Sequence, residues 1–310
     1  MRVLVIGYGS MGKRHAFCAR DLGHDVTVYD VRPIDAALVR SDIALADNLD
    51  AALATDPDAV VIATPARTHV AILIDALHRT TAAVYVEKPL AMYSIATASW
   101  YADDPMRHRR RGVVGYNLRF HDGYRWLKDH LEDAVGTPTT ARFVVQCDQS
   151  TWPGLNYADM LLEASHEIDL ALWIFGPAVV AGAVNHAGKG DCWTVLLEHD
   201  CGVVSTIVLD GTHSGYRRIA DISGPIGVRT LRWNNDLDLF GWQWRGRNMN
   251  SERDSSGVVT PNQMYRAALS AFLAGDDSGA ATFDDGNAVL MICDAARAIA
   301  KRTLNEIWLT

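Results

Sequence analysis

Four ionisable side chains stand in the otherwise apolar stretch LLEASHEIDLALWIFG at 161–176: Glu163, His166, Glu167 and Asp169. The pattern predicts a helix, and residues three and four apart share one face of a helix, so Glu163, His166 and Asp169 form one polar stripe. A buried helix tolerates such a stripe only where it is hydrogen-bonded or borders a cavity. A histidine there suits acid/base chemistry near neutral pH, and a histidine satisfied within a packed core is the alternative.

A glycine-rich turn near the N-terminus is the second candidate for chemistry. A β-branched run from Val3 to Ile6 leads into Gly7-Tyr8-Gly9-Ser10-Met11-Gly12 and then into a helical segment. The first glycine permits a tight turn, the second lets the backbone approach a pyrophosphate, and the third lets helix and strand pack closely. The helix N-terminus offers N–H groups and a positive dipole end to phosphates. The loop predicts a dinucleotide site, with Gly7, Gly9, Ser10, Met11 and Gly12 as its phosphate-binding residues.

The residue that ends the second strand bears on which dinucleotide binds. Asp30 follows the strand at 25–29, where a carboxylate accepts hydrogen bonds from a ribose 2′-hydroxyl and repels a 2′-phosphate. Arg32 lies close enough to favour the opposite choice. We expect NAD as the cofactor in preference to NADP, with Asp30 and Arg32 at the ribose.

Strands and helices alternate through the first 118 residues. Strands are predicted at 58–64, 82–88 and 111–117, and a helix at 68–78. Continuous apolar strands between helices are typical of a parallel sheet covered on both faces. Ligands of such sheets bind beyond the carboxyl ends of the strands. This rule selects Thr64, Pro65, Glu87, Lys88, Tyr116 and Asn117.

The pattern changes after Phe120. Strand-like runs at 140–149, 178–187, 191–200, 202–211, 217–223 and 229–234 predict an antiparallel meander with a helix at 157–175 packed against it. Residues 235–260 are polar and irregular, and we expect either a loop near the site or an oligomer contact there; helices follow at 261–274 and 284–302. The predicted fold is therefore α/β: a Rossmann domain (1–118), then an α/β domain (119–310) with a large, open, mainly antiparallel sheet, its last helix packing back on the first domain.

Composition limits the functional class. The chain has 310 residues and a formal net charge of −8, and nucleic-acid binding needs a basic face. Its five cysteines are scattered and lack CxxC spacing, which indicates reduced thiols and no zinc site. The chain begins at once with a strand-like run, and no apolar run approaches the roughly 20 residues that span a bilayer. We expect a cytoplasmic protein that binds neither nucleic acid nor membrane.

Several segments together resemble the Gfo/Idh/MocA family, the glucose–fructose oxidoreductase and inositol dehydrogenase group. The matching segments, in the family's order, are the Gly7–Gly12 loop, ATPARTH (63–69), EKP (87–89), GYNLRFH (115–121), SHEIDLALWIFG (165–176), NQMYRAALSAFLAG (262–275) and DDG (284–286). The resemblance implies hydride transfer between a nicotinamide cofactor and a sugar, a polyol or a derivative. It also places Thr64, Pro65, His69 and Glu87 among the cofactor contacts. The SHEID form is familiar from relatives in nucleotide-sugar and surface-sugar biosynthesis, which favours a modified sugar.

The resemblance assigns the catalytic roles. Lys88 of EKP is the substrate-orienting catalytic lysine, and an ammonium at a strand's carboxyl end suits it to stabilising a developing alkoxide. His166 is the acid/base, and Glu87 orients Lys88 or contacts the cofactor ribose. Many relatives have an Asp four residues before the histidine, where this chain has Leu162; Glu163, three residues before, is the replacement we expect. Family members often have a cis bond before the proline, which Pro89 permits.

The remaining candidates would line the substrate pocket. Asn117, Arg119 and His121 leave the last Rossmann strand, and a structural ion pair is the alternative for Arg119. The other substrate candidates are Trp152, Tyr157, Asp169 and Tyr265, with core packing as the alternative for the aromatic residues. No metal site is expected, because HExxD at 166–170 has Leu170 where a zinc motif has a second histidine.

The functional hypothesis is an NAD-dependent dehydrogenase or reductase acting on a secondary hydroxyl or ketone of a sugar, polyol or nucleotide sugar. Two alternatives come from other classes: a glycosidase or lyase that uses tightly bound NAD in transient oxidation, and a non-catalytic NAD-binding sensor. The presence of both Lys88 and His166 counts against the sensor. An open, solvent-facing sheet favours a homodimer or homotetramer, because an apolar face must be covered.

Overall fold

The computed structural model describes residues 1–94, 111–149, 159–186, 192–234, 240–248, 251–259 and 261–307. Its packing divides the chain into two units. The first contains residues 1–120 and 262–290, and the second contains residues 121–261 and 291–310. Trp152 and Tyr157 lie outside the described residues.

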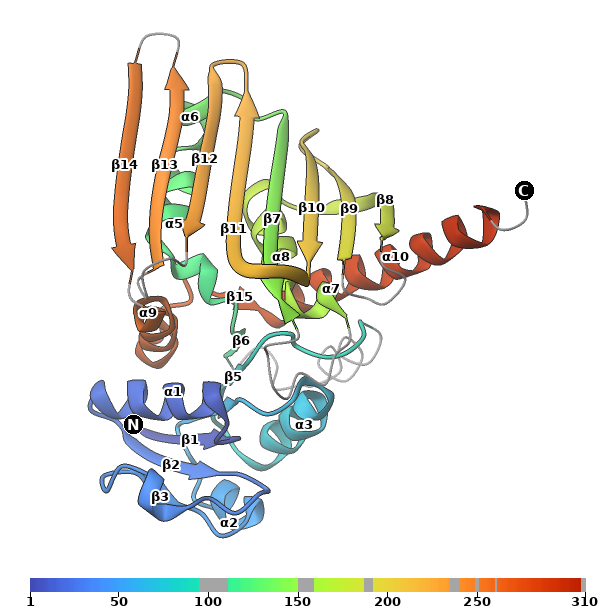
Figure 1. Cartoon of the computed structure of the whole chain (residues 1–310). Helices are drawn as coiled ribbons and strands as arrows, with labels where there is room; N and C mark the ends of the chain where they lie inside the picture. The colour runs from blue at the N-terminus through green and yellow to red at the C-terminus, as the bar shows by residue number, and fades with distance from the viewer. Residues whose placement is uncertain are drawn as a thin grey trace. The chain divides into compact units, whose positions relative to one another are not determined.

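The first unit is a parallel sheet with the strand order β15-β6-β5-β4-β1-β2-β3 (Figure 1). Its strands are β1 (Arg2–Ile6), β2 (Asp25–Tyr29), β3 (Ala44–Leu45), β4 (Ala59–Ile62), β5 (Ala83–Val86), β6 (Gly112–Val114) and β15 (Ala281–Thr282). Among the described strands of this sheet, only β15 pairs antiparallel, with β6. Every residue of β4 is buried, because helices cover both faces of the sheet. The predicted Rossmann fold is confirmed.

The helices described in this unit are α1 (Ser10–Asp21), α2 (Leu49–Ala54), α3 (His69–Arg79), α9 (Pro261–Ala274) and the first part of α10 (Phe283–Ile307), with 3-10 helices at Ala36–Leu38, Ala66–Thr68 and Asn117–Phe120. Residues 262–290, which the sequence assigned to the second domain, pack in the first. Phe272 and Leu269 of α9 join the core that β1 and α1 form, and Phe272 meets the Tyr85 ring edge-on at 5.6 Å. Buried apolar area on this face of α9 therefore decides its domain.

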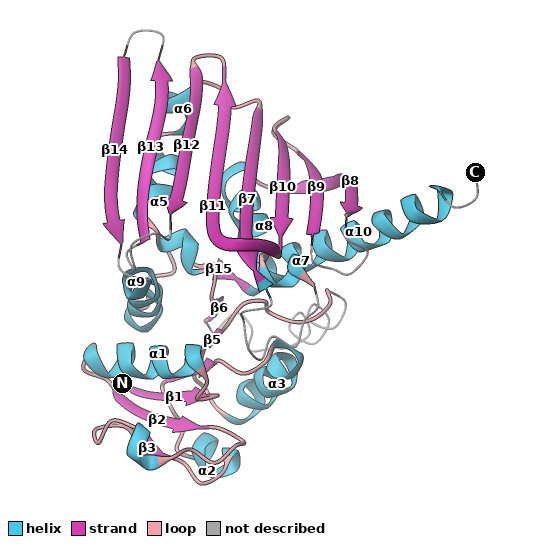
Figure 2. Cartoon of the chain, in the orientation of Figure 1, coloured by secondary structure: helices cyan, strands magenta, loops and turns pink. Residues whose placement is uncertain are grey.

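The second unit is built on a sheet with the strand order β14-β13-β12-β11-β7-β10-β9-β8. Its strands are β7 (Thr140–Asp148), β8 (Ala178–Asn185), β9 (Cys192–His199), β10 (Val204–Asp210), β11 (Thr212–Gly224), β12 (Gly227–Asn234), β13 (Phe240–Asn248) and β14 (Ser251–Val259). Buried and more exposed residues alternate along β9 and β10, so one face is packed and the other is open. The helices α5 (Asp122–Asp129), α6 (Leu131–Val135), α7 (Met160–Glu163) and α8 (Ser165–Phe175) lie on one side of this sheet (Figure 2).

The structure corrects two predictions about this sheet. The strands do not form one antiparallel meander, because β7 pairs with β10 in parallel and joins two antiparallel groups. Residues 240–248 and 251–259 are strands and not an irregular loop. β14 (SERDSSGVV) stands at the end of the sheet, where a charged strand is tolerated, and its polar composition concealed it.

The last helix, α10, is divided between the two units, and its residues up to Leu290 belong to the first. From Met291 onward α10 belongs to the second unit, where the guanidinium of Arg297 holds the Asp159 carboxylate with Nε and Nη2 each 2.7 Å from Oδ2. The buried thiol of Cys293 donates to the carbonyl of Leu161. These contacts fix α10 to the segment that leads into α8. Among the described residues, no helix is long and apolar enough to cross a membrane.

Candidate active site

The glycine-rich loop joins β1 to α1 as a tight turn. Gly7 has a φ of +94°, and a Cβ there would lie 2.6 Å from the carbonyl oxygen of Ala63. A Cβ on Gly12 would lie 1.8 Å from the carbonyl oxygen of Gly7. Gly9 differs, because its φ is −76° and a Cβ there would meet none of the described residues within 4 Å. The loop needs Gly7 and Gly12 for its own packing, whereas the part of the chain that the structure describes leaves space beside Gly9.

The start of α1 has the properties of an anion site. Ser10 and Met11 are its first two residues, directly after the N-cap Gly9. The first turn holds no acidic residue, and within the described part of the chain no side chain caps it. Its unpaired N–H groups and positive dipole end therefore remain for a ligand beside Gly9. A pyrophosphate fits this combination of free donors and space.

The carboxylate after β2 is fixed by the loop itself. Asp30 accepts hydrogen bonds from the backbone N–H of Tyr8 at 2.8 Å and from that of Arg32 at 2.9 Å, and the Arg32 guanidinium also contacts it. Burial raises the pKa of the Asp30 carboxyl, but the hydrogen bonds from Arg32 and Tyr8 outweigh this, so the pKa lies below its usual value. A charged Asp30 at the end of β2 suits a ribose diol better than a 2′-phosphate.

Lys88 follows β5 in a segment fixed from two directions. Its backbone N–H donates to Glu87 Oε2 at 3.2 Å, and Glu87 Oε1 lies 2.6 Å from Nε2 of His15 on α1. The Lys88–Pro89 peptide bond is cis. His69 places its ring nitrogens 2.9 Å from the carbonyl oxygen of Pro89 and 2.7 Å from that of Thr64. Both sides of the loop around Lys88 are therefore held by buried imidazoles.

Two buried histidines, His69 and His15, hold the loops of the first unit. His69, predicted among the cofactor contacts, is buried with both ring nitrogens facing backbone carbonyls, so it links the loops after β4 and β5. Burial lowers the pKa of His69, although the two carbonyls oppose the shift. Sequence reasoning missed His15. The sequence does contain a feature that could have identified it: His15 stands among small residues on the side of α1 that is buried, next to Ala16 and one turn before Ala19.

Pro65 and Thr64 lie where the strand-end rule placed them, in the turn after β4. The carbonyl of Pro65 accepts from Thr68 N–H at 2.8 Å, and Thr68 Oγ1 lies 2.8 Å from Thr64 Oγ1. Asn117 is buried in the 3-10 helix after β6, and its Nδ2 has no hydrogen-bond partner among the described residues. A buried amide of this kind has donor capacity to spare for a ligand.

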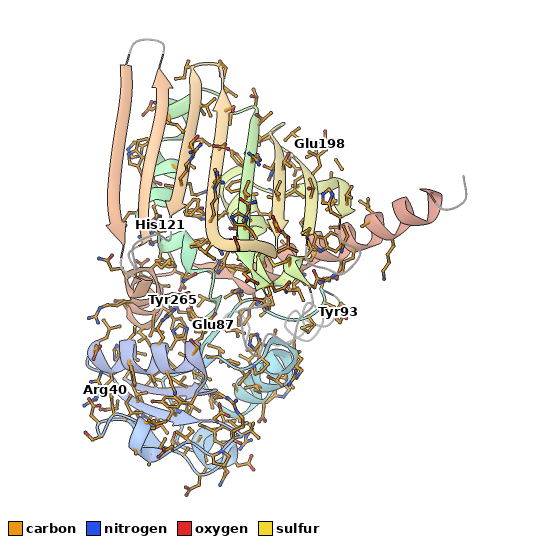
Figure 3. All side chains as sticks on the ribbon, viewed as in Figure 1. Arg40, Glu87, Tyr93, His121, Glu198 and Tyr265 are labelled. Atoms are coloured by element: carbon orange, nitrogen blue, oxygen red, sulfur yellow. The ribbon has the colours of Figure 1, made fainter. Side chains whose placement is uncertain are left out.

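Arg119 and Tyr265 have partners within the first unit. The Arg119 guanidinium lies 3.4 Å from the Asp285 carboxylate and 3.3 Å from the carbonyl oxygen of Ala280. Asp285 also accepts from the N–H of Thr282, the residue before α10, as in a capping box. The ring of Tyr265, labelled in Figure 3, is stacked under the Arg14 guanidinium at 4.4 Å. The contact of Arg119 matches the structural ion pair stated as its alternative, whereas Tyr265 is partly exposed and its ring contact is not the core packing stated for it.

The predicted helix 157–175 is two helices in the second unit. α7 ends at Glu163, Ala164 has φ −98° and ψ 26°, and α8 starts at Ser165. Glu163 therefore does not share a continuous helix with His166 and Asp169, as the i, i+3 argument assumed. Asp159 caps α7 by accepting from the N–H of Leu161, and its carboxylate is also held by Arg297. His166 and Asp169 remain one turn apart on α8, and both are buried.

The charge next to His166 is neutralised by a buried ion pair. Glu167 Oε1 lies 2.8 Å from Nη1 of Arg218 on β11, and both side chains are nearly inaccessible. The contact is an ion pair without good hydrogen-bond alignment. Burial lowers the pKa of Arg218, but Glu167 together with Tyr216 and Tyr124 outweighs it, so the pKa is raised. His121, labelled in Figure 3, accepts from Gly123 N–H at the start of α5 and is buried in the same unit.

Residues 1–115 match a family of proteins described as an oxidoreductase family with an NAD-binding Rossmann fold. Inositol 2-dehydrogenase of Klebsiella pneumoniae strain 342 is 32% identical over 253 residues, which cover 74% of each chain. Inositol 2-dehydrogenase 4 of Saccharopolyspora erythraea is 31% identical over 229 residues, covering 67% of this chain and 66% of that protein.

Solved structures share the fold across the whole chain. UDP-N-acetylglucosamine 3-dehydrogenase GnnA from Acidithiobacillus ferrooxidans superposes with a TM-score of 0.79 at 21% identity, covering 97% of this chain and 98% of that one. Levoglucosan dehydrogenase in complex with NADH and levoglucosan gives a TM-score of 0.78 at 19% identity, covering 97% of both chains. At this identity the similarity establishes the arrangement of elements.

Proposed function

Because the chain belongs to the Gfo/Idh/MocA family of NAD-dependent oxidoreductases, we propose that it transfers hydride between NAD and a secondary hydroxyl carbon of a polyol or sugar ring. The relatives that are about 30% identical are inositol 2-dehydrogenases, which supports a ring polyol as the substrate class. These relatives are named as dehydrogenases, so a glycosidase, a lyase or a sensor is not favoured. A nucleotide sugar is a second substrate class, suggested by the SHEID segment.

The proposal rests on two features found together in the first unit: a helix start that can bind phosphate, and a lysine whose backbone is held in place. Gly9 and the uncapped start of α1 fit a pyrophosphate, and Asp30 fits the ribose. Lys88 follows β5 at the carboxyl edge of the same sheet, where nucleotide ligands of such sheets bind. Bound NAD supplies the hydride acceptor, and the ammonium of Lys88 can orient the substrate hydroxyl and stabilise its oxygen as negative charge develops.

His166 is the acid/base of the proposed reaction. A neutral imidazole accepts the hydroxyl proton in the oxidation and returns it in the reduction. Asp169, one turn further along α8, and Glu163, at the end of α7, are its proposed carboxylate neighbours. The buried Glu167–Arg218 pair prevents an unbalanced charge beside the histidine.

The roles of Lys88 and His166 are tested by single and double substitution. Lys88→Ala and His166→Ala should each lower kcat by about 10²- to 10⁴-fold, because each removes a group that acts on the same hydroxyl. NAD affinity should change little, since the phosphate and ribose contacts remain. If the two residues act together, the double variant should lose far less than the product of the single effects. Multiplicative losses would contradict a shared role.

The substrate class is tested with purified protein, NAD or NADP, and a panel of inositols, sugars, sugar acids and nucleotide sugars. Reduced-nicotinamide absorbance and product mass are recorded together. Formation of NADH with loss of two hydrogens from a polyol supports the proposal. Cleavage of the substrate without net NADH would replace it with the transient-oxidation mechanism.

We also propose that the chain forms a homo-oligomer through the open face of the second sheet. Val179, Val184 and Leu196 are 62%, 44% and 37% exposed on β8 and β9, and such apolar surface favours a partner. Light scattering after size exclusion measures the mass directly. A monomer at micromolar concentration would refute this part.

A further inference from the structure

A buried histidine–glutamate pair connects the dinucleotide helix to the backbone of Lys88. His15 lies three residues after Gly12 on α1, and its side chain is fully buried. Its Nε2 is 2.6 Å from Oε1 of Glu87, and Glu87 Oε2 accepts the N–H of Lys88 at 3.2 Å. Figure 3 labels Glu87 in the first unit. The chain of contacts therefore runs from the phosphate-binding helix to the residue proposed to orient the substrate.

The tautomer of His15 follows from its surroundings. Its Nδ1 is buried and has no hydrogen-bond partner among the described residues, so a proton there would be an unsatisfied donor. Assigned from this network, the proton is on Nε2 and is donated to Glu87. The ring edge of Tyr85 lies against the imidazole at 5.1 Å, and Phe272 packs against Tyr85. His15 has little freedom to turn away from Glu87.

The His15–Glu87 pair contacts the backbone of Lys88 through its N–H group. The N–H of Glu87 still pairs with the carbonyl of Ile62 on β4, as expected for a strand end. The next N–H, that of Lys88, is directed to the Glu87 carboxylate. A carboxylate can accept from His15 and Lys88 at the same time, whereas without His15 nothing in this contact chain fixes its orientation.

We propose that His15 is a positioning residue: through Glu87 it sets the backbone of Lys88 relative to the helix that binds the pyrophosphate. This rests on the proposed function of Lys88. The position of the lysine is thereby tied to the position of the cofactor, which hydride transfer requires, because misplacement by about 1 Å costs about 10²-fold in rate. Of the two roles expected for Glu87, orienting Lys88 and contacting the cofactor ribose, the proposal uses the first and adds His15 as the residue that holds the carboxylate in place.

The test uses four variants of the full-length protein. His15→Met removes the donor at similar volume, and His15→Gln keeps an N–H at similar reach. The double variant His15→Met with Glu87→Met removes the donor and the buried charge together. His78→Met changes an exposed histidine of α3 and is the control. Stability, NADH affinity by fluorescence titration, and hydride transfer to the best substrate of the panel are measured for each.

The expected result separates positioning from folding. His15→Met should lower kcat by about 10- to 100-fold with the NADH Kd within about threefold, and His15→Gln should recover most of the loss. The double variant should regain stability, because no buried carboxylate is left without its partner, but should not regain turnover. Recovery of turnover together with stability would overturn the inference, as would an equal loss in NADH affinity and kcat.

A readout that needs no substrate keeps this inference distinct from the proposed function. Amide exchange of the segment 84–90, followed by mass spectrometry, should be about tenfold faster in His15→Met and close to wild type in His15→Gln. Unchanged exchange in His15→Met overturns the positioning role. Exchange could be faster in His15→Met although the wild-type protein oxidises nothing in the panel. That result would support the contact chain and would count only against the proposed function.

Discussion

Adding a single methyl group at Gly9 should separate cofactor binding from folding. Gly9 has a φ of −76°, which alanine adopts without strain, and the new Cβ would meet no described residue within 4 Å. Alanine restricts the unfolded chain, which stabilises by about 0.4–1 kcal/mol, but it is a poorer N-cap than glycine by a similar amount. The free energy of unfolding of Gly9→Ala should therefore stay within about 1 kcal/mol of wild type.

The affinity for NAD should fall, because the methyl group would enter the space that the pyrophosphate is expected to use. Displacing the ligand by the width of a methyl group breaks at least one hydrogen bond between an N–H of α1 and a phosphate oxygen. A hydrogen bond to a charged group contributes about 1.5–3 kcal/mol. The Kd for NADH should therefore rise roughly 10- to 150-fold.

Substitutions at the neighbouring glycines should behave in the opposite way. Gly7→Ala would force a φ of +94° on alanine and bring Cβ within 2.6 Å of a backbone oxygen, and Gly12→Ala would bring it within 1.8 Å. Both should destabilise the first unit by several kcal/mol. Gly182→Ala, whose Cβ would make an ordinary 3.9 Å contact on β8, is the control.

The assay combines urea unfolding with NADH fluorescence titration for all four variants. A folded Gly9→Ala protein with weakened NADH binding is the expected result. If Gly9→Ala binds NADH with wild-type affinity, the pyrophosphate does not lie beside Gly9, and the assignment of the open space is wrong. If Gly7→Ala is as stable as wild type, the close approach of the loop to Ala63 is wrong.

Two further predictions concern the second unit. Burial, followed by the charge of Arg218, lowers the pKa of His121 to about 3, below the roughly 6.5 of an unfolded histidine. Between these two pKa values the unfolded chain binds more protons than the folded protein, so the free energy of unfolding should fall as pH drops from about 6.5 toward 3, by up to about 1.4 kcal/mol per pH unit. His121→Asn, which keeps an acceptor for the start of α5, should flatten this slope in urea titrations. An unchanged slope would contradict the assignment. Arg218→Met should lower the free energy of unfolding by about 3–5 kcal/mol, because Glu167 of α8 stays charged and buried without its partner. Adding Glu167→Met should restore most of the loss. A loss below about 1 kcal/mol in Arg218→Met would show that the pair is not buried in solution.

Local sequence determined the parts of this protein that depend on short spacing. The turn at Gly7, the start of α1 and the strand before Lys88 are encoded within a few residues, since they follow from backbone freedom at glycine and from apolar runs. The same applies to β9 and β10 of the second sheet, whose alternating burial matches their alternating composition. The polar strand at 251–259 was missed because its apolar pattern is weak.

Tertiary structure decided which polar groups face one another. His15 and Glu87 are 72 residues apart, Arg119 and Asp285 are 166 apart, and Asp159 and Arg297 are 138 apart. Pairing at such separations depends on how helices pack on the sheets, and this is set by buried apolar area summed over many residues. The residue types that can do the chemistry are therefore readable from the sequence, whereas the groups that hold them in place become visible only once the chain is folded.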